Sequence, residues 1–435
     1  MTDEDERVLE KAITDFFYYT SILHVRPTAH EVHAAAKCAE LVMPQVGNVK
    51  DNYVLYNPLL TGSAAELDID PMLPAIGDVD IMYYRSTLLA IPQGHPPPTQ
   101  LPEEFHDNVK VSLCEIIDSH LPGYVYLELR YLLTKCTGSG RYNAKEYEQH
   151  KRIKITNPTH FHNLERHGPA YTMNQAQRGH ISSDLVYCVY CLSWLPQAGD
   201  WPTRRRNYDW PDLATVDSVV NNGCDMVQVA HRLCKEDEWM SKYQWRLSFS
   251  RAEIALLNSW LPEQQIVYHM LRVFMKSDRL TETANDSEVS ALSNYHIKTL
   301  MLWACELKPR SWWTGDFTVI RNSVVLLQTL AGWLSERRCS HYFINNCNLV
   351  DESFPLDTLA SRLLWIKRDW LSQWFLNNYI RRFVPMCPES VSRLFDDVSS
   401  SSKLERAIMK VAFWKCNKFE ADSWCAANKY EYFVM

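Results

Sequence analysis

The stretch that decides the fold of this chain is Leu-Thr-Gly-Ser-Ala-Ala-Glu at residues 60–66, followed by Gly-Asp-Val-Asp-Ile-Met at residues 77–82. Side chains two apart on a strand point to the same face, so Asp78 and Asp80 can share a site. Gly62 lets the backbone approach phosphates closely, and free amides at the start of the following helix favour an anion. The pattern predicts a site for a nucleoside triphosphate and its metal ions.

Two neighbouring carboxylates suit a hard divalent cation. Mg²⁺ usually takes one or two carboxylates from a protein beside the phosphates of its substrate. In a two-metal site, one ion activates the attacking oxygen and the other stabilises the leaving group. An isolated Asp-x-Asp also occurs at solvated strand ends and turns, so the Gly-Ser turn upstream is what strengthens this interpretation. We expect Mg²⁺ or Mn²⁺ at Asp78 and Asp80.

Three further motifs follow in order along the chain. They are Trp-Arg-Leu-Ser-Phe-Ser at residues 245–250, Leu-Ser-Asn-Tyr-His-Ile-Lys-Thr at 292–299 and His-Tyr-Phe-Ile at 341–344. With the first two stretches, they resemble the cyclic GMP-AMP synthase-like receptors and the related male-abnormal developmental (Mab-21) family, which shares the fold. The resemblance spans about residues 50–350. It implies an α+β, bilobal nucleotidyltransferase fold, with a mixed sheet core like that of DNA polymerase β and a C-terminal all-helical lobe.

The length of 435 residues also favours two packed lobes. We expect an N-terminal helical brace at residues 1–50, a nucleotidyltransferase core at 51–240 and a helical lobe at 241–435 that completes the nucleotide site. The expected elements are amphipathic helices at residues 4–25 and 28–43, β-rich runs at 125–129, 153–155 and 184–190, an exposed Pro-rich connection at 95–98, and helices from about residue 250 onward.

The resemblance also implies roles for individual residues. Asp78, Asp80 and Asp184 correspond to a catalytic, metal-binding triad, in which Asp184 lies on a strand beside the first two and helps to activate the attacking ribose hydroxyl. Taken alone, Asp184 is equally well a strand-entry residue that caps a turn. The implied nucleotide contacts are Thr61, Gly62, Ser63, Arg246, Ser248, Ser250, Glu253, Arg272, Asn294, Tyr295 and Lys298.

Several of these residues have a purely structural alternative. Ser250 and Glu253 have the spacing of a helix N-cap and capping box. Tyr295 can stack on a base or can be a core tyrosine of its helix. Arg272 stands where the family has Lys, and Asn294 where it has Ser. Both keep hydrogen-bond donors, so the resemblance implies nucleotide binding and leaves the base preference open.

We expect no zinc. Residues 254–262 contain no Cys or His, so the zinc-bearing thumb with which vertebrate cyclic GMP-AMP synthase binds DNA is missing. Cys188 and Cys191, three apart on one strand, face opposite sides, and no second pair follows at zinc-ribbon spacing. His160 and His162 lack further ligands that the sequence singles out. The 13 cysteines are scattered, which favours reduced buried thiols over disulfides.

The net charge of −7 is unusual for a protein that binds nucleic acid, although a local basic face is compatible with it. The chain shows no apolar run long enough for a membrane helix and no signal-peptide core, so we expect a cytoplasmic protein without a membrane partner. Solvated surface or local ion pairs are the alternative for every basic cluster. The candidates are Lys151-Arg152 with Lys154, Arg204-Arg205-Arg206, Lys367-Arg368, Arg381-Arg382, and Lys403, Arg406 and Lys410.

The leading hypothesis is a nucleotidyltransferase that joins ATP and GTP into a cyclic dinucleotide acting on a downstream receptor. By resemblance it is an innate immune sensor switched on by a ligand such as double-stranded RNA. The second hypothesis is an interaction protein of the developmental type with weak or silent catalysis, favoured by the acidic charge and by an aromatic-rich tail after about residue 386. A template-independent polymerase shares the metal chemistry, but residues 245–253 and 293–299 argue against it.

Overall fold

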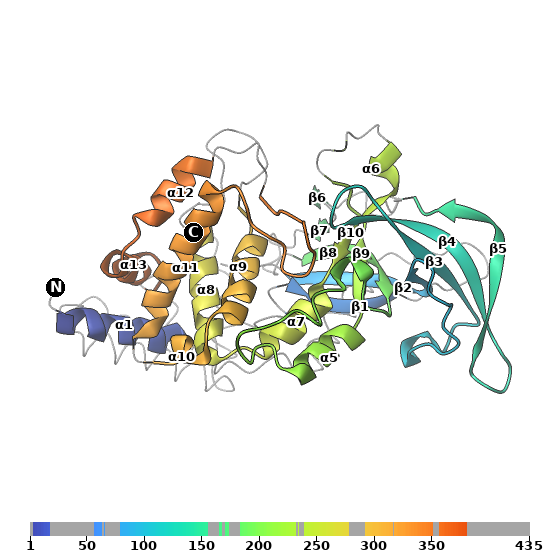
Figure 1. Cartoon of the computed structure of the whole chain (residues 1–435), viewed down its shortest axis with the longest axis horizontal. Helices are drawn as coiled ribbons and strands as arrows, with labels where there is room; N and C mark the ends of the chain where they lie inside the picture. The colour runs from blue at the N-terminus through green and yellow to red at the C-terminus, as the bar shows by residue number, and fades with distance from the viewer. Residues whose placement is uncertain are drawn as a thin grey trace.

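Two lobes lie side by side in the computed structural model of the chain (Figure 1). The structure describes residues 3–17, 56–62, 65, 79–154, 165–167, 170–173, 183–231, 234, 239–277, 292–315, 317–350 and 356–380. One lobe is built on a mixed β-sheet, and the other consists of helices. The predicted α+β class, with a mixed sheet core and a C-terminal helical lobe, is confirmed. The predicted domain boundaries stay predictions.

The sheet has ten strands in the order β1-β2-β3-β4-β10-β9-β8-β7-β6, with β5 paired to β4. Because β8 also pairs with β2, the strands from β2 through β3, β4, β10 and β9 to β8 form a closed circuit. The strands are β1 Tyr56–Thr61, β2 Val79–Pro92, β3 Lys110–Asp118, β4 Tyr124–Lys135, β5 Tyr142–Arg152, β6 Glu165–His167, β7 Ala170–Met173, β8 Ser183–Cys191, β9 Cys224–Val227 and β10 Gln244–Ser248.

Strand β2 is the centre of this arrangement because it pairs with three neighbours. Its first half lies between β1 and β8, and its second half pairs with β3 and β8 after an irregularity between Tyr84 and Leu89. Alternate residues of the central strands enter two different apolar clusters. Cys188 belongs to one cluster and Cys191 to the other, both buried and unbridged, which confirms that they are core thiols on opposite faces.

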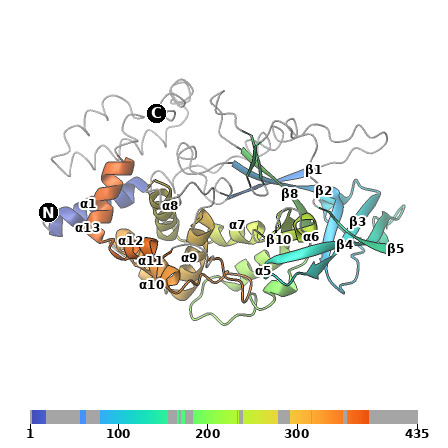
Figure 2. The same cartoon turned by 90° about the horizontal axis from the view of Figure 1, so that it is seen from above.

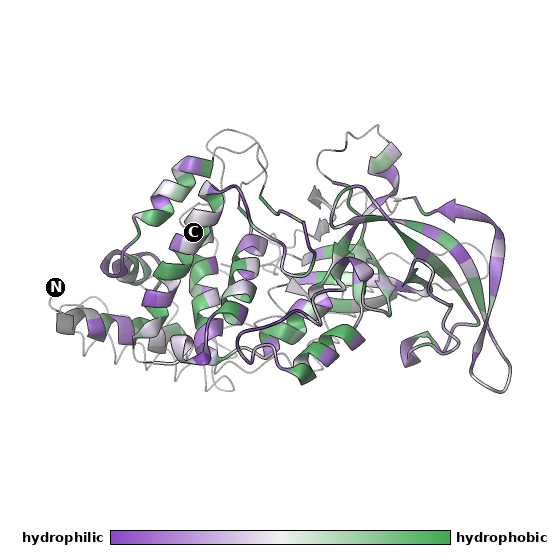
Figure 3. Ribbon diagram, viewed as in Figure 1, coloured by the Kyte–Doolittle hydropathy of each residue, from purple (hydrophilic) through white to green (hydrophobic). Residues whose placement is uncertain are grey.

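Helices α8, α9 and α11 form the core of the second lobe (Figures 1 and 2). Their apolar residues face inward, whereas the outer strand β5 is largely hydrophilic (Figure 3). The helices are α1 Asp3–Phe17, α5 Leu213–Asn221, α6 Trp239–Tyr243, α7 Ser250–Asn258, α8 Pro262–Ser277, α9 Asn294–Leu307, α10 Arg310–Trp313, α11 Thr318–Ser335, α12 Leu356–Leu364 and α13 Arg368–Phe375. Short 3₁₀ turns occupy Glu103–Phe105 and Pro196–Ala198, and a π-helical turn, Leu376–Ile380, follows α13.

The N-terminal helix α1 packs on the helical lobe, against α8, α11 and α13. Leu9, Ala12, Ile13 and Phe17 of the predicted apolar face are buried, so this part of the prediction is confirmed. On its polar side, Glu10 receives two hydrogen bonds from the guanidinium of Arg368, at 2.8 and 2.6 Å. The predicted continuation to residue 25, the helix at 28–43 and the tail after 386 lie outside the described residues.

The capping box predicted at Ser250 and Glu253 is wrong. Ser250 is the first residue of α7, Phe249 occupies the N-cap position, and no side chain caps this helix. A capping box instead begins α9, where Ser293 accepts from the backbone of His296 and the His296 side chain accepts from the Ser293 backbone. Sequence spacing alone did not distinguish these two helix starts. The side chain of Glu253 bonds Lys298 of α9 and does not cap its own helix.

Two further segments, residues 153–155 and 95–98, were also predicted from the sequence. The extended run predicted at residues 153–155 is not a strand where it is described, because β5 ends at Arg152 and the Ile153 amide then donates to the Leu127 carbonyl at 2.8 Å. The Pro-rich connection at 95–98 is largely exposed, as predicted. Within the described residues, none of the helices is both long enough and apolar enough to span a membrane.

Candidate functional site

A cavity of about 610 Å³ lies between the sheet and the helical lobe. The sheet contributes Thr61, Gly62 and Asp80, which we call the sheet wall. On the opposite side are Glu253 of α7, Tyr295 and Lys298 of α9, and His341 from the segment between α11 and α12, which we call the helical wall. The turn from β10 into α7 joins the two walls through Arg246, Ser248 and Ser250.

The backbone register places two of the three predicted carboxylates together. Asp80 on β2 pairs directly with Asp184 on the parallel strand β8. Residues paired in this way project from the same face of a sheet, so both carboxylates lie on one face. Thr61 is the partner of Asp80 on the other side, and its hydroxyl donates to the Asp80 carbonyl at 3.3 Å. Asp184 itself is not among the residues that line the cavity.

Gly62 follows β1 directly and lies against the Asp80 carboxylate. Its φ of +61° is in the left-handed region, where a side chain is strained. A Cβ built at this position would meet the Asp80 Oδ2 atom at 1.9 Å, so no larger residue fits without moving the carboxylate. Because Gly62 has no side chain, space remains for a ligand beside the Asp80 carboxylate.

The donor set at this wall is the kind that a hard divalent cation prefers, because carboxylate oxygens are the usual protein ligands of Mg²⁺. The third predicted ligand, Asp78, and the predicted phosphate contact Ser63 lie outside the described residues. In the part of the chain that the structure describes, no group of three His, Cys, Asp or Glu residues is placed to hold a metal ion. Asp80 and Asp184 fit as two carboxylate ligands of a site that would need a further donor.

The turn from β10 into α7 adds polar groups to the cavity. Arg246 is exposed and is the register partner of Tyr124 on β4. The hydroxyl oxygens of Ser248 and Ser250 lie 3.1 Å apart. A guanidinium and two hydroxyls in one turn form a cluster of hydrogen-bond donors suited to phosphate or to polar base edges.

Hydrogen bonds join residues of the helical wall. Lys298 donates from Nζ to Glu253 Oε2 at 2.7 Å. The Tyr295 hydroxyl bonds His341 Nε2 at 2.9 Å, and the Glu253 carboxylate acts on it electrostatically. Burial raises the pKa of Tyr295 well above its usual value, and the negative charge of Glu253 raises it further. Burial lowers the pKa of His341 to about 3, with a further lowering from the positive charge of Arg246.

Eight of the eleven predicted nucleotide contacts line this cavity, Ser63 lies outside the described residues, and two lie elsewhere. Arg272 is buried within α8, with its guanidinium 5.4 Å from the centre of the Tyr268 ring, and no residue of α8 lines the cavity. Asn294 is exposed at the start of α9 and does not line it either. It shares this helix with Tyr295 and Lys298 but points in another direction, because successive residues of a helix face different sides.

Sequence reasoning assigned no role to three cavity residues. His341 begins the His-Tyr-Phe-Ile motif at residues 341–344, but nothing in that motif indicated a contact with Tyr295. Tyr124 and His231 were missed entirely, and their rings meet edge to face at 5.0 Å. The alternation of β4 would have identified Tyr124 as a neighbour of Arg246 only if the pairing of β4 with β10 had been known.

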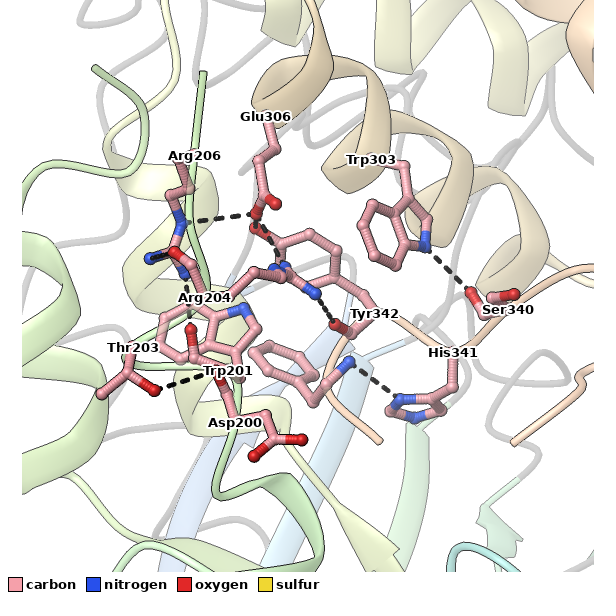
Figure 4. A network of polar contacts seen from close by, with 11 residues as sticks. Asp200, Trp201, Thr203, Arg204, Arg206, Trp303, Glu306, Ser340, His341 and Tyr342 are labelled. Carbon is pink, nitrogen blue, oxygen red and sulfur yellow. Dashed lines mark hydrogen bonds and ion pairs between the residues drawn. The ribbon is translucent and has the colours of Figure 1, made fainter. Parts of the chain in front are cut away.

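Arg204 and Arg206 of the Arg204-Arg205-Arg206 cluster join the lobes (Figure 4). Arg204 lies 2.7 Å and Arg206 3.4 Å from Glu306 Oε2 of α9, and the Tyr342 hydroxyl donates to the same oxygen at 2.7 Å. The Arg204 guanidinium also lies 4.5 Å from the centre of the Trp303 ring. Arg204 and Arg206 thus form ion pairs within the protein, which is the alternative that the sequence analysis gave for this cluster, while Arg205 is exposed.

In the other basic clusters that the structure describes, some side chains are exposed and others contact aromatic rings or a carboxylate. Lys151 and Lys154 are exposed, whereas the guanidinium of Arg152 lies 4.7 Å from the ring centres of both Tyr126 and Trp239. Arg368 pairs with Glu10, as described above. The two basic clusters nearest the C-terminus, beginning at residues 381 and 403, lie outside the described residues.

Comparisons with known proteins agree with this architecture. Residues 141–259 match the family model for the Mab-21 protein nucleotidyltransferase domain, and residues 263–361 match that for the Mab-21 protein HhH/H2TH-like domain. The chain is 27% identical over 195 residues to protein mab-21-like 3 of Danio rerio, covering 43% of this chain and 45% of the relative. It is 28% identical over 176 residues to protein mab-21-like of Aedes aegypti, covering 40% and 45%.

A third relative, protein mab-21-like of Anopheles gambiae, is 28% identical over 183 residues, covering 41% of this chain and 47% of the relative. The chain therefore spans about half the length of the curated relatives it matches. The two family models together cover about half of this chain, one on each lobe. The chain thus carries a Mab-21-type nucleotidyltransferase domain followed by an HhH/H2TH-like domain, and it resembles Mab-21-like proteins at modest identity.

Proposed function

We propose that this protein is a metal-dependent nucleotidyltransferase that joins ATP and GTP into a cyclic dinucleotide. The observation that carries the proposal is the pairing of Asp80 with Asp184 in parallel strands beside an interlobe cavity that polar residues of both lobes line. Carboxylates fixed by strand register are held in place by the backbone itself. Such rigidity suits a site in which reacting groups must be positioned closely.

In the proposed reaction, a ribose hydroxyl attacks the α-phosphate of a bound triphosphate. The new O–P bond forms as the bond to pyrophosphate breaks, and the hydroxyl proton passes to a base, a role that we assign to Asp184. A second attack of the same kind closes the ring. Mg²⁺ or Mn²⁺, held by Asp80, Asp184 and the neighbouring Asp78, would stabilise charge on the leaving pyrophosphate.

The remaining cavity residues have roles in nucleotide binding. The Gly62 backbone admits a triphosphate next to Asp80. Arg246, with Ser248 and Ser250, donates to phosphate or to base edges. Tyr295 offers a ring on which a purine can stack, which contributes about 1–3 kcal/mol per base in comparable sites.

We further propose that the protein is a cytoplasmic innate immune sensor and that double-stranded RNA activates it. The resemblance to cyclic GMP-AMP synthase-like receptors supports this, as do the exposed cations Lys151, Lys154 and Arg205. Binding to RNA through these residues would weaken as the salt concentration rises, because phosphate contacts release counterions.

The deciding experiment incubates purified protein with labelled ATP and GTP and with Mg²⁺ or Mn²⁺, alone or with double-stranded RNA or DNA. We expect a phosphatase-resistant dinucleotide in the presence of double-stranded RNA. Asp80→Asn should abolish the product and leave the fold intact. Linear products would indicate a template-independent polymerase, and unchanged synthesis by an Asp80→Asn/Asp184→Asn protein would refute the assignment.

The competing proposal is an interaction protein without robust catalysis. Its supporting observation is a group of exposed apolar side chains at the junction of α12 and α13, where Trp365 is 79%, Leu364 52% and Trp370 46% exposed. Exposed aromatic groups of this kind are enriched at protein interfaces. Nucleotide binding without product under all the conditions above would favour this second function.

A further inference from the structure

His341 has a defined tautomer because its two ring nitrogens face different partners. Nδ1 accepts hydrogen bonds from the backbone amides of Phe343 and Ile344, at 3.0 and 3.1 Å. A nitrogen that accepts carries no proton, so the single proton of the neutral ring lies on Nε2. The side chain is only 8% exposed, and its low pKa keeps the ring neutral near pH 7. His341 Nε2 therefore donates to the Tyr295 hydroxyl oxygen at 2.9 Å.

This donation holds the Tyr295 side chain at its hydroxyl end. The Tyr295 oxygen accepts from His341, and the negative charge of the nearby Glu253 acts on the same hydroxyl and raises its pKa. Glu253 accepts from Lys298, which lies 5.8 Å from the centre of the Tyr295 ring. The tyrosine hydroxyl is thus bonded by His341 from another segment of the chain. A ring tethered in this way loses the freedom to rotate out of the cavity wall.

His341 is in turn held by the network that joins the lobes (Figure 4). Its neighbour Tyr342 bonds Glu306, and the Arg204 guanidinium donates to the Tyr342 carbonyl at 3.0 Å. Phe343, two residues after His341, stacks on Phe249 with ring centres 4.6 Å apart. The segment that directly follows the imidazole is therefore fixed by contacts with both lobes.

We propose that His341 is a positioning residue for the nucleotide base, because it orients the Tyr295 ring as a stacking platform through a hydrogen bond to the tyrosine hydroxyl. The inference rests on the proposed function, since it assumes that a purine base stacks on Tyr295. His341 contacts the base only through Tyr295. Its effect is therefore confined to the part of the affinity that comes from the base.

The test compares two ligands that share the triphosphate. One is dideoxy-ATP, which lacks both ribose hydroxyls and cannot react, and the other is inorganic tripolyphosphate, both with Mg²⁺ in calorimetric titrations. His341→Asn keeps an oxygen near the place of Nδ1 for the two amides and removes the Nε2 donor. We expect it to weaken dideoxy-ATP binding about fivefold, the worth of one hydrogen bond, and to leave tripolyphosphate binding unchanged. Thermal unfolding verifies that the variant folds.

A second variant breaks the same bond from the other side. Tyr295→Phe keeps the ring and removes the hydroxyl, so adding His341→Asn to it should change the affinity for dideoxy-ATP by less than about twofold. The exposed His120 provides the matched control, and His120→Asn should change neither affinity.

Two results would overturn the inference, and they differ in what else they overturn. If the wild-type protein binds dideoxy-ATP no better than tripolyphosphate, the base site fails and the proposed function fails with it. If the wild type prefers dideoxy-ATP and His341→Asn keeps the full preference, only the role of His341 fails. Additive losses in the double variant would likewise show that His341 acts by a route other than the Tyr295 hydroxyl.

Discussion

The two walls of the cavity are held in place by different forces. Asp80 of the sheet wall and its strand partner Asp184 owe their positions to the pairing of β2 with β8, which depends on backbone hydrogen bonds. On the helical wall, Tyr295 is held by a side-chain bond to His341, and Glu253 by one to Lys298, so the contacts join separate segments of the chain. The comparison teaches that a side chain can be changed on the sheet wall without disturbing the architecture, whereas a change on the helical wall alters position and stability together.

After Asp80→Asn, which should abolish the product, the largest effect should come from Asp184→Asn. Loss of one carboxylate charge should lower product formation about 10²–10³-fold, because a fixed charge at the reacting centre is lost. The free energy of unfolding in urea should change by less than about 1 kcal/mol, since the strand register is unaffected. Asp217→Asn, an exposed change on α5, is the control and should alter neither quantity. A large loss of stability in Asp184→Asn would contradict the view that strand register is the main support of these carboxylates.

Gly62→Ala tests whether the sheet wall tolerates a new atom. The added Cβ would lie 1.9 Å from Asp80 Oδ2, so the carboxylate must move, and we expect about a hundredfold loss of activity. Gly94→Ala isolates the backbone cost, because Gly94 has a φ of +75° and nothing within 4 Å of the added atom. It should lose about 1 kcal/mol of stability and keep full activity. Equal activity in Gly62→Ala and Gly94→Ala would show that the reaction does not need the space that Gly62 leaves beside Asp80.

Glu306→Gln tests the network behind the helical wall. Arg204 and Arg206 would then lose the negative charge of their partner, which is 3% exposed. We expect a loss of about 2 kcal/mol in the free energy of unfolding, measured in urea, since breaking a buried pair leaves charge uncompensated. Glu336→Gln, an exposed change at the end of α11, should have no measurable effect. Similar curves for both variants would show that the network contributes nothing to holding the lobes.

The smallest expected effect is a dependence on pH that originates at His341. Its pKa is about 3 in the folded protein and about 6.5 when unfolded, so the unfolded state binds more protons between these values. This contribution to stability is complete above pH 6.5 and is lost as the pH falls toward 3. Between about pH 7.5 and 5.5, wild type should therefore lose about 1.4 kcal/mol more than His341→Asn in urea unfolding. Parallel losses in the two proteins would mean that His341 is not buried as a neutral ring.

Part of the fold follows from local sequence patterns. The β-rich run at residues 184–190 and the helical periodicity after about residue 250 agree with the class that the family resemblance implied, and Cys188 and Cys191 were correctly interpreted as core thiols on opposite faces. The capping box at Ser250 was wrong because Glu253 is drawn to Lys298, 45 positions away, and a local pattern contains no information about a partner at that distance. For the same reason the sequence left open whether Arg204 and Arg206 lie on a basic surface or in local ion pairs, and the structure shows ion pairs.

By itself the sequence determined which residue types stand at which spacing: Asp80 on an apolar strand, a glycine after β1, and a tyrosine and a lysine one helical turn apart on α9. These depend on the chain's own periodicity, which each segment carries alone. Only the tertiary structure decided that Asp184 pairs with Asp80, that Arg272 is turned into α8 and that His341 reaches Tyr295. Contacts between distant segments depend on how whole elements pack, and that packing is a property of the complete fold.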